Sequence, residues 1–295
     1  MPVRVGLWYN RQRATPNLSE RNLLLTIVNR LQELVQYREL VRNLVVRDLK
    51  VRYRNSVLGF LWSLVNPLLT MAVFTVVFTV LAGESGIPNY PLFVLCAVLP
   101  WNLFSSSVMG AVVSIVGNAH LINKIYFPRE ILPLSTVLAN LVNFLLALIP
   151  LFVVMVLFRA PFTVYLLLLP LVILVQLAFT LGVAFFLSCL NVFFRDTGVI
   201  MDVVLFAWFF LTPVFYPMQR LPQSYEIMGL TLDIQRIMYI VNPMSSIIAT
   251  YRSVLYYGTP PAPDFFSRTI VTVLVVLVLG YLFFARYAPV FGEEV

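Results

Sequence analysis

Six long apolar stretches alternate with short polar segments along the chain. A transmembrane helix needs about 20 mostly apolar residues, and the stretches lie close to or above that length. The fourth exceeds 30 residues, so its helix must tilt or project beyond the bilayer. The pattern predicts an all-α integral membrane protein with six transmembrane helices: about Phe60–Leu81, Leu92–Val116, Ile131–Phe158, Val164–Phe194, Val199–Tyr216 and Thr269–Phe284.

Cationic residues flank these stretches unevenly. Eleven of the chain's 20 Lys and Arg residues precede position 55, and others occupy the second loop, the fourth loop and the C-terminal tail. The loop of residues 83–90 contains a single charged residue, an acid. Because Lys and Arg are retained on the cytoplasmic side of a membrane, both termini are predicted to be cytoplasmic. The cations of the long last loop are exceptions, and long loops obey this rule less strictly.

Residues 37–55, directly before the first stretch, have the periodicity of an amphipathic helix. Their apolar side chains recur at helical spacing: Tyr37, Leu40, Val41, Leu44 and Val45. Charged residues fall on the opposite face, as in helices that lie in the membrane–water interface. We therefore predict a cytoplasmic interface helix, with a soluble helix packed on a cytosolic partner as the alternative.

A shorter helix is predicted before the last stretch. Asn242 supplies an N-cap and Pro243 a first-turn proline, while Gly258 provides a terminator at the other end. At about 15 residues, or roughly 22 Å, this segment is too short to cross a bilayer. It also carries Arg252, so we expect it to dip into the membrane from outside, covered by protein.

Several activities are excluded by missing residue types. Neither of the two lysines, Lys50 and Lys124, follows a glycine, so the sequence has no phosphate-binding Gly-Lys-Ser/Thr loop. The single histidine, His120, excludes a paired-histidine zinc site, and the two cysteines have no metal-binding spacing. Only Asp202 among the 13 acidic residues falls in a predicted span, which argues against an ion-coupled carrier. The cations beside the spans explain the net charge of +7 better than nucleic-acid binding does.

Five segments, in order and at the expected spacing, resemble the ABC-2-type permeases. They are Arg47–Pro67, Asn123–Glu130, Phe194–Asp196, Phe210–Pro217 and Asn242–Met244. More narrowly, the chain is similar to the subfamily that exports O-antigen polysaccharides and teichoic acids. The resemblance covers roughly residues 37–286.

The resemblance implies a transport subunit rather than an enzyme. Two copies of the chain would form a homodimer, and two separate nucleotide-binding subunits would hydrolyse ATP. ATP and Mg would then bind the partner subunit, and this chain would bind no cofactor. The expected cargo is a lipid-linked polysaccharide, of O-antigen or teichoic-acid type, moved across the bacterial cytoplasmic (inner) membrane. Membrane lipids are the other expected partner, and nucleic acid is not expected.

The resemblance also divides the chain into regions: a cytoplasmic tail (1–36), the interface helix (37–55), a six-helix transmembrane domain (56–286) and a second cytoplasmic tail (287–295). The transmembrane domain would contain a coupling loop (118–130) and an external gate region (218–267).

The coupling loop has a composition suited to a cleft of the ATPase subunit. Its candidate residues are an apolar plug of Ile125, Tyr126 and Phe127, a polar rim of Lys124, Arg129 and Glu130, and the flanking Asn123 and Pro128. The alternative is an ordinary cytoplasmic loop with snorkelling cations and an interfacial tyrosine.

Four cations of the interface helix form a second candidate site: Arg47, Lys50, Arg52 and Arg54. They would fix this helix on an anionic membrane surface and offer counter-charges to the pyrophosphate of a lipid-linked cargo.

Six aromatic residues form a third candidate site, a translocation path with an external gate: Trp101, Trp208, Phe215, Tyr216, Tyr251 and Tyr256. Rings on which sugar C–H faces stack would let a polymer slide, and the alternative is an aromatic belt at the headgroup level. Pro213 frees a backbone carbonyl, so the turn after it should lie against protein or a cavity. Ser106, Gly110 and Ser114 share a helix face, where close packing is favoured over a wet path.

Other functions remain as alternatives. The same architecture exports drugs, haem-like molecules or simple lipids, although the short loops favour the polymer exporters. A membrane-embedded polyprenyl-phosphate sugar transferase would need clustered charges at the interface, for which only Arg195, Asp196 and Asp202 are available. A structural scaffold has no positive support.

Overall fold

The computed structural model describes residues 36–54, 56, 59–81, 86–220, 225–227, 230–232 and 234–295. The predicted N-terminal tail, residues 1–36, lies outside these ranges except for its last residue. Residues Val41–Val295 form one compact unit. The predicted interface helix is present as α2 (Arg38–Tyr53).

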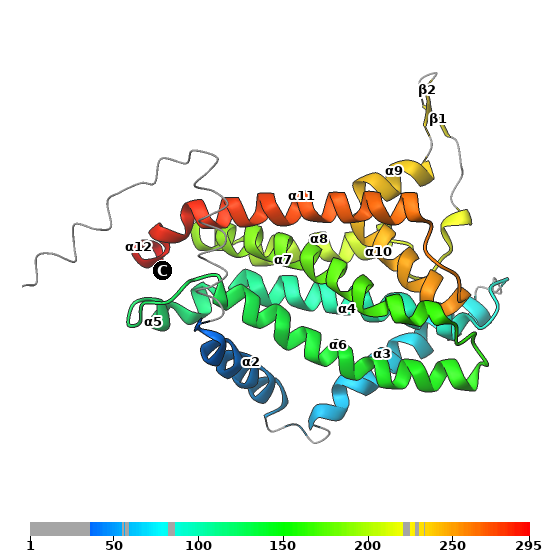
Figure 1. The fold of residues 1–295 in the computed structure, drawn as a ribbon, viewed down its shortest axis with the longest axis horizontal. Coiled ribbons are helices and arrows are strands. Elements are labelled where there is room, and N and C mark those ends of the chain that lie inside the picture. Colours follow the sequence, from blue (N-terminus) through cyan, green and yellow to red (C-terminus); the bar gives the residue numbers. More distant parts are fainter. Residues whose placement is uncertain are drawn as a thin grey trace, which may run out of the picture. The chain divides into compact units, whose positions relative to one another are not determined.

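Within the described part of the chain, five helices are long and apolar enough to cross a membrane. They are α3 (Trp62–Thr75) with its π-helical continuation η3 (Val76–Leu81), α4 (Tyr90–Ser114), α6 (Ile131–Leu157), α7 (Leu169–Phe193) with the preceding turn η5 (Val164–Leu168), and α11 (Pro263–Tyr287). The chain is therefore a multi-pass membrane protein, and the predicted all-α architecture is confirmed (Figure 1).

Two of the predicted spans have different bounds in the structure. α8 (Thr197–Leu211) has 15 residues, or about 22 Å. It ends before the predicted Tyr216 because Pro213 disfavours helical backbone at the residue that precedes it. α11 begins at Pro263 rather than at the predicted Thr269, since proline is well suited to the first turn of a helix. A sixth transmembrane span, which would require α8, stays a prediction.

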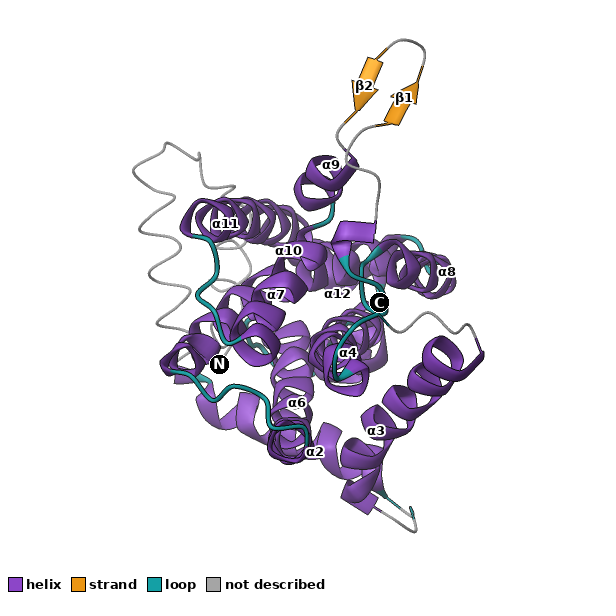
Figure 2. Ribbon diagram, turned by 90° about the vertical axis from the view of Figure 1, so that its right-hand side faces the viewer, coloured by secondary structure: helices purple, strands orange, loops and turns teal. Residues whose placement is uncertain are grey.

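Helix α4 is the centre of the packing, and Figure 2 shows α3, α6, α7 and α8 around it. In the apolar part of α4, 78% of the residues are buried, against 6% in the span that α3 and η3 form together. Side chains on α3 such as Leu69 and Val73 are more than half exposed. Lipid or a second protein surface must therefore cover α3, whereas the chain itself covers α4.

Helices α7 and α11 approach most closely at a pair of glycines. A Cβ atom added to Gly182 would lie 2.7 Å from the Cα atom of Leu277, and one added to Gly280 would collide with the carbonyl group of Gly182. Two backbones can come this close only where side chains are absent, a common device in membrane helix packing.

The predicted short helix is present as α10 (Pro243–Arg252) with its π-helical end η7 (Ser253–Tyr257). The side chain of Asn242 accepts a hydrogen bond from the backbone N–H of Ser245, and Gly258 ends the helix with φ of 64°. Nearly all of α10 is buried. The predicted N-cap, first-turn proline, glycine terminator and protein cover are thus confirmed.

Short elements complete the described chain: η2 (Gly59–Leu61), η4 (Val116–Asn118), α5 (Ala119–Ile122), η6 (Met218–Arg220), β1 (Tyr225–Ile227), β2 (Leu230–Leu232), α9 (Ile234–Val241), η8 (Ala288–Val290) and α12 (Phe291–Glu294). The antiparallel hairpin of β1 and β2 lies in the predicted gate region and was not predicted from the sequence.

Candidate functional site

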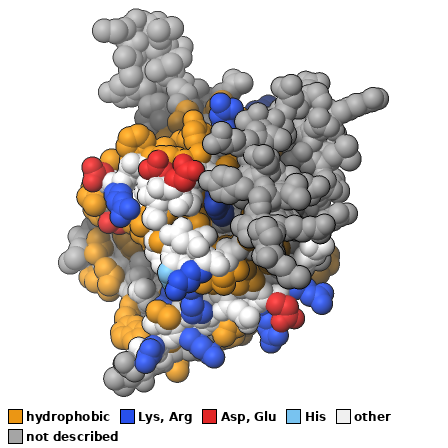
Figure 3. Space-filling model, turned by 90° about the vertical axis from the view of Figure 1, so that its left-hand side faces the viewer, with side chains coloured by type: hydrophobic (Ala, Val, Ile, Leu, Met, Phe, Trp, Pro, Cys, Tyr) orange, Lys and Arg blue, Asp and Glu red, His pale blue; other side chains and the backbone are white. Residues whose placement is uncertain are grey.

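The coupling loop lies at the end of the molecule where α5 and α12 meet. Charged side chains surround apolar ones on this end, which faces the viewer in Figure 3. Residues Asn123–Tyr126 are exposed, and the side chain of Tyr126 reaches 87% exposure. Ile125 beside it is 55% exposed, so two neighbouring side chains form a small apolar patch on this end of the molecule.

The second half of the loop is packed into the chain, which corrects part of the predicted site. Phe127 is only 7% exposed, so it belongs to the interior and not to the exposed plug. Pro128 and Glu130 are also buried. Arg129 donates a hydrogen bond to the carbonyl oxygen of Ala288, and burial lowers the pKa of its guanidinium although the neighbouring carboxylate opposes the change. The exposed plug therefore reduces to Ile125 and Tyr126.

The C-terminal segment, η8 and α12, packs against this half of the loop. Phe291 is fully buried, and its ring centroid lies 5.3 Å from that of Phe284 and 6.4 Å from that of Phe193. The segment therefore joins the ends of α7 and α11 to the loop, a contact that the sequence did not predict.

The four candidate cations of the predicted interface helix divide into two pairs. Arg47 donates to the side-chain oxygen of Asn118 at 2.9 Å and forms a salt bridge with Asp48 at 3.0 Å. Arg52 donates to the side-chain oxygen of Asn140 at 2.9 Å. Lys50 and Arg54 are exposed, and neither side chain has a hydrogen-bond or ion-pair partner among the described residues.

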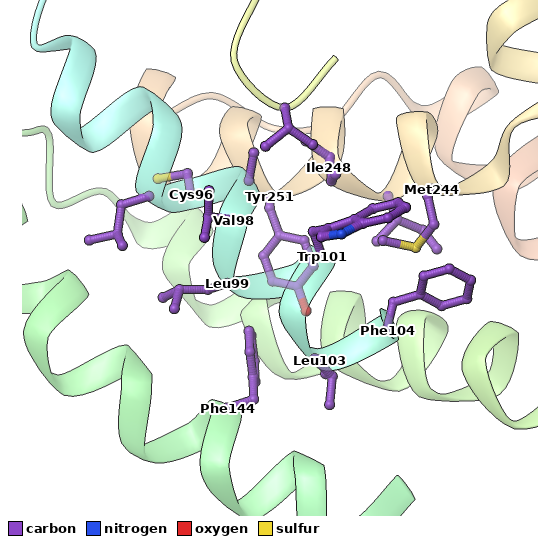
Figure 4. Close-up of a cluster of buried hydrophobic side chains, with 14 of the residues drawn as sticks. Cys96, Val98, Leu99, Trp101, Leu103, Phe104, Phe144, Met244, Ile248 and Tyr251 are labelled. Carbon is purple, nitrogen blue, oxygen red and sulfur yellow. The ribbon is translucent and has the colours of Figure 1, made fainter. Parts of the chain in front are cut away.

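Two members of the predicted aromatic path lie in the interior of the chain. Trp101 is 5% exposed, and Tyr251 is fully buried, where its hydroxyl group donates to the side-chain oxygen of Gln176 at 2.7 Å. Figure 4 shows both rings among other buried side chains, including Phe104. In this structure neither ring is open to a sugar, because protein side chains cover it on every side.

Trp208 is half-buried and bonded. Its indole N–H donates to the side-chain oxygen of Asn242 at 2.8 Å, and its ring packs edge-on against Phe104 at 5.1 Å. Tyr256 donates its hydroxyl proton to the carbonyl oxygen of Pro88. Both residues therefore have structural roles, whatever further contact they make with a cargo.

Aromatic residues on α3 and its continuation η3 extend the cluster. The ring of Phe215 stacks on that of Phe74 at 5.7 Å and on that of Phe78 at 5.0 Å, so that rings bridge α3 and the turn after α8. Phe74 and Phe78 are not among the site residues predicted from the sequence. Their spacing of four residues, which places both on one helix face, is the signal that identifies them.

The turn after α8 is fixed by a buried arginine. The Arg252 guanidinium donates to the carbonyl oxygens of Pro213 at 2.6 Å and Val214 at 2.5 Å, and lies 3.5 Å from the ring centroid of Phe93. Thr212 accepts a further hydrogen bond from the Asn242 amide at 2.9 Å. The prediction that this turn lies against protein is confirmed, and its carbonyl groups are paired within the chain.

Metal-ligating groups are not clustered in the part of the chain that the structure describes. Within those residues, no three His, Cys, Asp or Glu side chains come together in a way that would hold a metal ion.

Known proteins resemble most of this chain. The model of the ABC-2 type transporter family matches residues 39–256. The chain is 37% identical over 262 residues to the O-antigen export system permease protein RfbA of Myxococcus xanthus, which covers 88% of this chain and 97% of that protein. It is 33% identical over 249 residues to the protein of the same name from Klebsiella pneumoniae, covering 84% and 91% of the two chains.

Proposed function

The chain belongs to the ABC-2 type transporter family, and we propose that it is the permease subunit of an ATP-driven exporter. Its cargo is a lipid-linked polysaccharide of the O-antigen type, carried across the bacterial cytoplasmic membrane. The observation that supports this proposal most strongly is the likeness to O-antigen export permeases, which extends over 97% of the first relative's length.

The proposed energy source is a separate ATPase subunit that docks on the coupling loop. Exposed Ile125 and Tyr126 offer the apolar contact, and Lys124 contributes charge beside them. The absence of a phosphate-binding loop in the sequence fits this division of labour. In the proposed orientation both termini and this loop are cytoplasmic, as the distribution of cations indicates.

A homodimer is part of the proposal. The exposed side chains along α3 leave an apolar helix face that a second copy would cover, and the stacked rings of Phe74 and Phe78 lie on the same helix. A path for a polymer between two copies would then be bordered by α3 from each side.

Deleting the gene from its native host tests the function. We expect the mutant to synthesise the polysaccharide and to retain it inside the cell, because polymer synthesis does not depend on the permease. Surface staining and fractionation measure the two pools, and complementation with the intact gene should restore display. An unchanged amount of surface polymer in the deletion strain would refute the proposal.

Two further outcomes separate the alternatives. Accumulation of a drug or a simple lipid, with normal polymer display, would identify the rival exporter function. Loss of the polymer from every fraction would point to a synthetic enzyme, because a sugar transferase is needed to make the polymer and a permease is not.

A further inference from the structure

A polar cavity of about 360 Å³ lies between α2, α3, α4 and α6. Its size is within the range of about 300–1,000 Å³ that is usual for small-molecule sites. The polar residues that line it are Arg52, Tyr53, Ser56, Ser63, Asn66, Asn102, Ser106, Asn140 and Asn143. Arg52, Trp62 and Ser106 are exposed, so the cavity is a partly polar groove that opens at the surface of this chain.

The amide groups around the cavity are only partly used by the fold. Asn143 accepts a hydrogen bond from the Tyr53 hydroxyl group at 2.7 Å, but its amide nitrogen is buried and has no hydrogen-bond partner among the described residues. Asn102 is half-buried, and Ser106 is exposed. A fold that needed polar contacts only for helix association would pair these groups, and here donors remain available at the cavity.

Ser106, Gly110 and Ser114 share one face of α4, which is closely packed at one end and open at the other. A Cβ atom on Gly110 would lie 2.6 Å from a methyl carbon of Thr136, and Ser114 is 5% exposed with its hydroxyl group bonded to the backbone of Ala111. These two positions pack closely, as the sequence analysis favoured. Ser106, on the same face, opens onto the cavity instead.

The chemistry of the lining fits a sugar bearing a phosphate. Amide and hydroxyl groups both donate and accept hydrogen bonds, as sugar hydroxyl and acetamido groups require, and the side chains of Trp62 and Phe144 add apolar faces. Arg52 is held by a neutral amide, and its charge is paired with no carboxylate within the described residues. A guanidinium left with that charge is a good phosphate ligand.

We propose that this cavity binds the first sugar of the cargo, the one joined to the lipid phosphate, with Arg52 contacting that phosphate. This inference rests on the proposed function and adds to it a site for one residue of the cargo. The cavity is far too small for a polymer. It therefore recognises the end that all cargo molecules share, and it does not bind the polymer that follows.

Cysteine protection in the complete permease–ATPase complex, held in lipid nanodiscs, tests the site. Ser106→Cys reports on the cavity, and Ser105→Cys is the matched control, because it is the neighbouring residue on α4 and does not line the cavity. The natural Cys96 and Cys189 are fully buried. Without a probe, we expect a water-soluble thiol reagent to label Ser106→Cys at least tenfold faster than the natural cysteines.

The probes are short-chain prenyl diphosphates that carry one hexose, one N-acetylhexosamine or no sugar. A sugar-bearing probe should slow labelling of Ser106→Cys at least fivefold and leave Ser105→Cys unchanged, and the sugar-free probe should protect much less. Adding Asn102→Leu should weaken protection by roughly three- to tenfold, the usual effect of losing one hydrogen bond. Co-purification of the ATPase verifies that each variant is assembled.

Three results would overturn the inference. They are slow labelling of Ser106→Cys without a probe, equal protection by the sugar-free probe, and no protection by either sugar-bearing probe. These outcomes are distinct from failure of the proposed function, because the gene deletion measures export itself. A strain that loses polymer display while Ser106→Cys stays unprotected would keep the exporter function and lose only the sugar site.

Discussion

Replacing Arg252 by Met should release the turn that follows α8. The guanidinium is fully buried and is bonded to the carbonyl oxygens of Pro213 and Val214. Methionine preserves the unbranched apolar stem and removes every donor. The two carbonyl groups would then face a buried space without a hydrogen-bond partner, so the turn should separate from α10.

The expected magnitude follows from those contacts. Each carbonyl group left unpaired costs about 1–3 kcal/mol, and the lost contact between Arg252 and the Phe93 ring adds about 2 kcal/mol for a desolvated pair. Removing a buried charge offsets part of this loss, because its desolvation no longer opposes folding. We expect a net destabilisation of about 3 kcal/mol, equivalent to roughly a hundredfold change in the opening equilibrium of the turn.

Hydrogen exchange of the peptide that contains Val214 and Phe215 is the direct assay, with thermal unfolding in detergent as the second measurement. Arg252→Lys should fall between wild type and Met, since one ammonium group cannot bridge two carbonyl oxygens in the same fork geometry. Arg268→Met is the control: Arg268 is exposed, so its loss should change stability by less than about 0.5 kcal/mol. If Arg252→Met exchanged hydrogen at the wild-type rate in this peptide, Arg252 would not hold the turn after α8.

Three further predictions follow from the packing. Tyr126→Ala should abolish co-purification of the ATPase without lowering the melting temperature, since the ring is 87% exposed. Phe127→Ala should instead destabilise the protein by about 3 kcal/mol, because its ring is buried. The reverse pattern would exclude the docking role of Tyr126. Gly280→Ala should lower membrane accumulation because its Cβ atom would meet the carbonyl group of Gly182, while Gly117→Ala, whose Cβ atom meets nothing within 4 Å, should be neutral. Arg52→Lys should reduce export while leaving membrane insertion normal, and normal export would leave this cation only an anchoring role.

The elements that were predicted well are those with local signals. Apolar runs of sufficient length identified the membrane helices, and the Asn242–Pro243 pair with Gly258 identified the bounds of α10 taken together with η7. Helix caps act through neighbouring backbone groups, so a few adjacent residues contain the whole signal. The end of α8 was predicted less well, because the apolar composition continues through a turn that only Pro213 interrupts.

The side-chain roles were predicted less well, because they depend on distant partners. Tyr126 and Phe127 are neighbours of similar chemistry, and only the packing of the loop leaves one exposed and buries the other. A loop has no periodicity from which the inward side can be inferred. Likewise, Trp101 and Tyr251 are residue types that occur both in an aromatic belt and in a translocation path. They are buried because α4 is central in the packing and because α10 is covered by the rest of the chain.

The packed half of the coupling loop connects the proposed ATPase contact to the proposed sugar site. Phe127 and Glu130 anchor the residues directly before α6, which begins at Ile131 and continues unbroken to Leu157. Asn143 lies on that same helix and lines the cavity. Because a helix is stiff along its axis and the loop is packed rather than free, a displacement applied at Tyr126 must be taken up either by the buried loop or by α6. We expect the buried loop to transmit the displacement to α6, whose motion against α3 and α4 would change the cavity.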